Sequence, residues 1–232
     1  MNSDRKAAII AGVLFIIGTV AGLLQAFTAP VLDAANFLTD VSVKQNQVRI
    51  EVFLALIAAF ACAGIAIWLY PVLKKHNEAL ALGSVGFRII ESVLSILGAI
   101  CLVSILPLSQ EYIKAGASSA SYLQTLGTSL FGAQGMILNI RLIPFCIGAL
   151  MYYYIFYKSK LIPRWLSGWG LIAIIMNLVS ALLVLFGLID HFSTTQVILS
   201  VPIGLQEMVL AVWLIVKGFN PSAIASGSAK QI

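Results

Sequence analysis

Six long apolar stretches alternate with short polar segments along the chain. Each stretch contains at least 20 residues, and a helix of that length crosses the roughly 30 Å hydrocarbon core of a bilayer. The pattern predicts membrane-spanning helices over residues 7–29, 48–70, 80–106, 128–157, 167–189 and 198–217. The expected fold class is therefore all-α, a polytopic six-helix transmembrane bundle. It forms one domain over residues 1–220, followed by a flexible cytoplasmic tail at 221–232.

Composition and charge support this interpretation. Of the 232 residues, 60% are hydrophobic and 10% are charged, whereas a soluble domain carries about 25% charged residues. Lys and Arg gather near both termini and in the segments 71–79 and 158–166, which share one side of a six-helix bundle. Because basic loops stay in the cytoplasm, both termini are expected there. This bias and attraction to anionic membrane lipids account for the net charge of +5, so no nucleic-acid partner is expected.

Several charged residues interrupt the apolar stretches. Arg88 and Glu91 lie within 80–106, Arg141 lies within 128–157 and Glu207 lies within 198–217. A charge at the centre of a spanning helix costs about 2.5 to 3.5 kcal/mol, so such side chains normally face a partner or a wet cavity inside the bundle. We therefore expect a polar interior.

The stretch 80–106 shows this arrangement most clearly. Ser84, Arg88, Glu91, Ser95 and Gly98 follow one another at steps of four, three, four and three residues, which keeps them on one helical face. That face is expected to point inward. The alternative to a functional site is an ion pair between Arg88 and Glu91 that only fixes this helix in the bundle.

Depth in the membrane indicates which charges meet. Glu207 lies about 15 Å from the cytoplasmic end of its helix, at the level of Glu91, so we expect it within ion-pair or one-water reach of Arg88 or Arg141. Arg141 is expected higher, with Arg49 and Glu51, and Pro144 is expected to bend the helix beside it. The candidate binding residues are Arg88, Glu91, Arg141, Glu207, Glu51, Arg49, Ser84 and Ser95.

No cofactor or metal is predicted. His76 and His191 fall near opposite membrane surfaces, which excludes a haem held by both inside the bundle. The three cysteines lie on different predicted helices with no metal-site spacing, so they are interpreted as small apolar residues. Gly18 and Gly22 form a small-residue pair that packs either against another helix of the chain or against a second copy.

Three segments resemble the bacterial domain-of-unknown-function 4386 family. They read AGVLFIIGTVAGLL, ACAGIAIWLYPVLKKHNEALALGSVGFRIIE and GALMYYYIFYKSKLIPRWLSGWGLI, and with similar spacing they cover nearly the whole chain. The resemblance implies a small multi-pass protein of the bacterial cytoplasmic (inner) membrane. It implies no catalytic residue, although Arg88 and Glu91 lie within the resembling region.

Three classes of function fit these observations. The first is a small-solute or proton-coupled carrier, or a membrane receptor, with a small-molecule ligand held by the intramembrane charges. The second is a membrane enzyme that acts on a lipid or isoprenoid and uses a glutamate as general acid or base. The third is an accessory membrane subunit whose buried charges only specify packing. The absence of a nucleophile or phosphate motif favours the first class.

Overall fold

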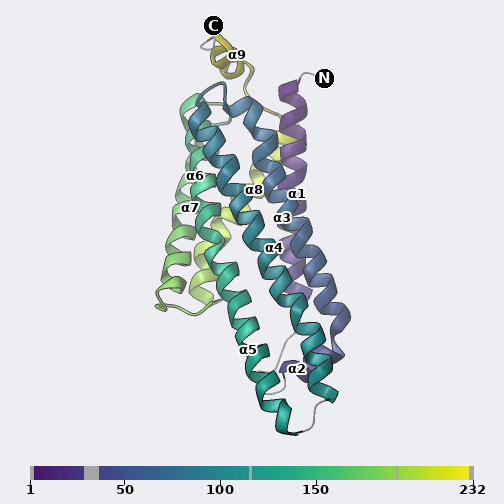
Figure 1. Ribbon diagram of the computed structural model, residues 1–232. Helices are drawn as coiled ribbons and strands as arrows, with labels where there is room; N and C mark the ends of the chain where they lie inside the picture. The colour runs from purple at the N-terminus through teal and green to yellow at the C-terminus, as the bar shows by residue number, and fades with distance from the viewer. Residues whose placement is uncertain (1–2, 29–36, 115–116, 192, 230–232) are drawn as a thin grey trace.

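The computed structural model describes residues 3–28, 37–114, 117–191 and 193–229. Within these ranges the chain is all-α and has no strand (Figure 1). The helices are α1 (Ser3–Thr28), α2 (Phe37–Val43), α3 (Gln45–Leu73), α4 (Glu78–Lys114), α5 (Ala117–Ile140), α6 (Leu142–Ser159), α7 (Arg164–Leu185), α8 (Thr194–Val216) and α9 (Pro221–Ala229).

Six stretches of helix are long and apolar enough to cross a membrane, which confirms the predicted six-helix bundle. They are α1, α3, α4, the run formed by α5 and α6, α7 and α8. The described parts of α1 and α9 lie at the same end of the bundle (Figure 1), as an even number of crossings requires. Which side of the membrane this end faces stays a prediction.

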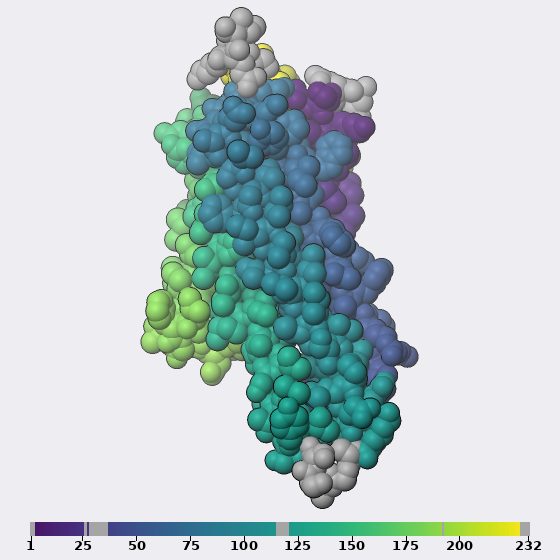
Figure 2. Space-filling view, viewed as in Figure 1, coloured from purple at the N-terminus to yellow at the C-terminus, as the bar shows by residue number. Residues whose placement is uncertain are grey.

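The opposite end of the bundle is uneven. The 37 residues of α4 extend about 55 Å, well beyond a bilayer core, and the α4–α5 hairpin projects past the turn between α7 and α8 (Figures 1 and 2). The sequence-based bounds at 106 and 128 were therefore too short. Hydropathy falls beyond residue 106, but the helices continue because they bury a second apolar core against α2. Its residues are Phe37, Leu38, Val41, Val48, Leu102, Ile105 and Leu106.

Helix α5 ends at Ile140 and α6 begins at Leu142, so Arg141 forms the junction between them. Pro144 lies one turn further on. Since proline has no N–H group, the carbonyl of Ile140 loses its helical partner there. Arg141 itself keeps helical torsion angles (φ −58°, ψ −24°), and its N–H donates to the backbone oxygen of Ile137 at 3.0 Å. A bend of the run beside Arg141 stays a prediction.

The small residues of α1 are used within the chain. A Cβ atom on Gly18 would touch the Cβ of Ala61 in α3 at 3.5 Å, so this face packs against a neighbouring helix, the first of the two expected arrangements. Association of two copies through Gly18 and Gly22 stays a prediction.

Near the chain ends, polar contacts join the helices. Arg5 donates hydrogen bonds to the carbonyl oxygens of Leu214 (3.0 Å) and Ile215 (2.6 Å) at the end of α8. Part of the expected tail is helical: Asn220 Oδ1 accepts from the Ser222 N–H at 3.2 Å and so caps α9, where the sequence analysis expected no helix.

Candidate functional site

The predicted inward face of α4 is buried. Arg88 is 1% exposed and Glu91 is 2% exposed, and Arg88 Nη1 lies 2.9 Å from Glu91 Oε2. The two atoms are close, but they do not align as a hydrogen bond, so the contact is an ion pair by proximity. Ser95 Oγ donates to the backbone oxygen of Glu91 at 2.9 Å, so its hydroxyl group has a hydrogen-bond partner within its own helix.

Close contact between α4 and α6 keeps Arg88 out of the lipid. A Cβ atom on Gly148 would lie 3.1 Å from Phe87 Cβ and 3.2 Å from Arg88 Cγ, so only glycine fits this approach without a shift of its neighbours. The guanidinium carbon of Arg88 lies 4.8 Å from the centre of the Phe145 ring, within cation–π range. Arg88 is therefore held by an anion on one side and an aromatic face on the other.

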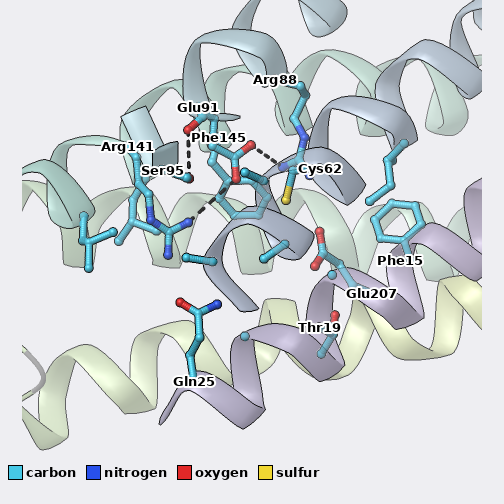
Figure 3. A pocket seen from close by; sticks show the side chains of 18 residues that line it. Phe15, Thr19, Gln25, Cys62, Arg88, Glu91, Ser95, Arg141, Phe145 and Glu207 are labelled. Atoms are coloured by element: carbon cyan, nitrogen blue, oxygen red, sulfur yellow. Dashed lines mark hydrogen bonds and ion pairs between the residues drawn. The ribbon is translucent and has the colours of Figure 1, made fainter. Parts of the chain in front are cut away.

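Arg141 is the second cation near Glu91. Its Nη1 atom lies 4.0 Å from Glu91 Oε1, and 33% of its side chain is exposed. Each carboxylate oxygen of Glu91 thus has one arginine beside it, as Figure 3 shows. The Arg141 contact is the longer and the more accessible of the two, so Arg141 keeps more of its positive charge free for another partner.

Glu207 of α8 faces the same space, but fewer neighbouring groups balance its negative charge. Among the described residues it forms no ion pair within 4.0 Å, and its buried Oε1 atom has no hydrogen-bond partner. The expected direct ion pair with Arg88 or Arg141 is therefore wrong. The physical reason is that Glu91, one turn from Arg88 on the same helix, already lies beside both arginines. Contact through one water stays a prediction.

A cavity of about 180 Å³ joins these groups. Arg88, Glu91, Arg141 and Glu207 all line it (Figure 3). Small side chains of α1 and α3 leave the room for it. They are Gly18, Gly22, Ala55, Ala58 and Ala59.

Three of the predicted site residues lie outside this cavity lining. Arg49 is exposed and donates to Asn46 Oδ1 at 3.1 Å near the start of α3. Glu51 lies one turn before Ala55, where the α3 lining begins, and Ser84 donates to the backbone oxygen of Ala81 at 2.8 Å. Arg49 and Glu51 are not grouped with Arg141, because α3 carries them towards the uneven end of the bundle. Ser95, in contrast, lines the cavity.

Sequence reasoning missed several lining residues. Phe145, Cys62, Thr19 and Gln25 all face the cavity. Phe145 follows Arg141 by four residues, so helical spacing could have placed it on the same face. Thr19 and Cys62 carry no comparable signal, because small polar residues in spanning helices commonly serve packing.

In the part of the chain that the structure describes, no group of three His, Cys, Asp or Glu side chains is placed to hold a metal ion. Outside the spanning segments, burial and the nearby positive charge of Arg141 lower the pKa of His191, in the turn between α7 and α8.

Comparison with known proteins agrees with the resemblance seen in the sequence. The family model described as Domain of unknown function (DUF4386) matches residues 10–218, so the chain belongs to this family. No curated protein and no solved structure matches the chain.

Proposed function

We propose that this member of the DUF4386 family is a carrier or receptor that binds a small ligand in the charged cavity inside its bundle. We place it in the bacterial cytoplasmic membrane with both termini inside, as the distribution of Lys and Arg predicts. The observation that carries the proposal is Glu207, whose buried Oε1 atom faces the cavity with no hydrogen-bond partner among the described residues.

A purely structural role explains only some of the buried charged residues. Arg88 and Glu91 form a close pair that can hold α4 in place. Glu207 adds a further charge, at a cost of about 2.5 to 3.5 kcal/mol at mid-membrane, without an ion pair within 4.0 Å among the described residues. A group retained at such a cost is normally functional, because a proton or a ligand supplies the missing partner.

The residues have distinct roles in this proposal. Arg88 is a fixed cation, since Glu91 and Phe145 both hold it. Arg141 lies at the junction of α5 and α6 and is the more exposed of the two arginines, so it is the cation that a ligand can reach. Glu207 is the exchangeable group, which takes either a proton or the cationic part of a ligand.

The test uses Cys62, which lines the cavity. The variant Cys101→Ala/Cys146→Ala leaves Cys62 as the single thiol of the chain. A cationic reagent, 2-aminoethyl methanethiosulfonate, should then modify Cys62 in intact membranes, because a cavity that a charged ligand can enter, from the water or from the bilayer, is also open to a small cationic reagent. Modification only after denaturation would show a sealed ion pair and would favour the accessory-subunit role. The variant that also carries Cys62→Ala controls for other labelling.

Charge preference at the cavity gives a sharper readout. The ratio of labelling rates for the cationic reagent and the anionic 2-sulfonatoethyl methanethiosulfonate should fall several-fold in Glu207→Gln, because the substitution removes a negative charge near Cys62. Arg141→Gln should raise the same ratio. Unchanged ratios in both variants would contradict the proposed roles of these two residues.

A further inference from the structure

A largely apolar groove leads from the lipid-facing surface to the charged cavity. It has a volume of about 560 Å³ and opens between α1 and α8, and it is also lined by residues of α5, α6 and α7 and by His191 in the turn before α8. Leu23 of α1 and Val197, Val201 and Leu205 of α8 form part of its wall and are exposed on the surface of the bundle. Arg141 and Glu207 line both the groove and the cavity, so the two spaces meet at these charges.

The surroundings of three glycines show where α1 and α8 separate. At one end the helices touch closely, since a Cβ atom on Gly12 would lie 2.8 Å from the backbone oxygen of Ala211. Further from the chain termini, a Cβ atom on Gly22 or on Gly204 would meet no described atom within 4 Å. The helices are therefore in tight contact at one end and open towards the other, and the apolar side chains at the opening are exposed on the outer surface of the bundle.

The charges at the inner end of the groove are of opposite sign. Arg141 shares Glu91 with Arg88 and lies 4.0 Å from it, whereas Arg88 lies at 2.9 Å, so positive charge remains at Arg141. Negative charge remains at Glu207, which has no ion pair within 4.0 Å among the described residues. A ligand with an anion alone or a cation alone would complement only one of these two groups.

We infer that the ligand is a membrane lipid whose headgroup carries both a phosphate and an ammonium, and that this headgroup enters sideways between α1 and α8. The phosphate lies against Arg141 and the ammonium against Glu207, while the acyl chains stay in the bilayer along the apolar wall. This inference rests on the proposed function, because it identifies the ligand of the same cavity. An apolar entrance favours a molecule that arrives with its chains in the lipid phase over a free solute.

Three ligands distinguish a lipid that carries both charges from an anionic lipid and from a free headgroup. The purified protein in detergent is titrated with short-chain phosphatidylethanolamine, with phosphatidylglycerol of the same chain length, and with free phosphoethanolamine, and thermal unfolding is followed by tryptophan fluorescence. We expect phosphatidylethanolamine to raise the melting temperature and to bind at least about tenfold more tightly than either alternative, a difference of about 1.4 kcal/mol. Glu207→Gln and Arg141→Gln should each weaken this binding by a similar factor.

A variant with a blocked groove tests whether the lipid enters between α1 and α8. Gly204 lines the groove, and a Cβ atom there would meet no described atom within 4 Å, so the side chain of Gly204→Leu should occupy the groove and remove lipid binding. Gly86→Leu is the matched control, because Gly86 is exposed on α4 and also has no described atom near its Cβ position. The control should bind lipid as wild type does, and both variants should keep wild-type thermal stability in the absence of added lipid.

Each contrary outcome overturns a stated part of the inference. Equal affinity for phosphatidylglycerol would refute recognition of the ammonium, and equal affinity for phosphoethanolamine would refute a lipid ligand. Wild-type binding by Gly204→Leu would refute the entrance between α1 and α8. Failure of all three probes to bind, with Cys62 still open to aqueous reagents, would refute this inference and leave the proposed function standing. A sealed Cys62 would refute the proposed function itself.

Discussion

Arg141 Nη1, at the junction of α5 and α6, lies 4.0 Å from Glu91 Oε1 of α4. Arg88 Nη1 lies 2.9 Å from the other carboxylate oxygen. Glu91 is thus the common anion of two cations from different parts of the bundle. This sharing explains why Glu207, at the same cavity, has no arginine within ion-pair distance among the described residues.

Substitution of Glu91 should strongly destabilise the fold. Glu91→Gln leaves the buried Arg88 without its countercharge, and removal of one partner of a buried pair costs about 3 to 5 kcal/mol. Thermal or denaturant unfolding in detergent measures the loss. Ser95→Ala, one turn away on the same face, is the control and should change stability little. Wild-type stability of Glu91→Gln would show that Arg88 has another anion.

Glu207→Gln should behave in the opposite way. Because Glu207 has no ion pair within 4.0 Å among the described residues and its Oε1 atom accepts no hydrogen bond there, the amide removes a costly charge without breaking an ion pair. The free energy of unfolding should equal or exceed that of wild type, while the labelling ratio at Cys62 changes. A loss of stability as large as that of Glu91→Gln would mean that Glu207 has a structural partner.

Gly148→Ala tests the close contact that shields Arg88. The added methyl group would lie 3.1 Å from Phe87 Cβ and 3.3 Å from the backbone oxygen of Ser84, so α4 and α6 must move apart. We expect a loss of about 1 to 3 kcal/mol in the free energy of unfolding. Gly86→Ala, on the exposed face of α4, should be close to neutral. Equal stability of the two variants would contradict the tight α4–α6 contact.

Topology can be tested at the end of the chain. A reporter that is active only in the cytoplasm, fused after Ile232, should be active, because the basic segments predict that both termini lie inside. The matched fusion uses a reporter that is active only in the periplasm and should be silent. The reverse result would place the termini and the α9 end of the bundle outside.

Acidification should weaken the fold through His191. Burial and the charge of Arg141 lower the pKa of His191 in the folded protein. As the pH falls below the ordinary value of about 6.5, the unfolded chain therefore takes up this proton first and stability decreases. The decrease in melting temperature between about pH 7.5 and pH 5.5 should be smaller in His191→Gln than in wild type. An identical decrease in both proteins would remove His191 from the pH response.

Local pattern in the sequence determined much of the architecture. The six apolar stretches and the buried face of α4 that carries Arg88 and Glu91 follow from hydropathy and helical period. These properties depend on residues within a few turns of one another, so they can be predicted without knowledge of the fold. The same reasoning could not see the helical hairpin beyond residue 106, because it depends on packing against α2.

Only the tertiary structure decided which charges meet and where the bundle opens. Helical spacing shows which residues of one helix share a face, but the rotation of that helix against its neighbours depends on contacts such as Gly148 with Arg88. Those contacts brought Arg141 to Glu91 and left Glu207 facing the cavity. Likewise, the separation of Gly22 from Gly204 is a relation between the two ends of the chain. Such relations depend on non-local packing, which no local pattern records.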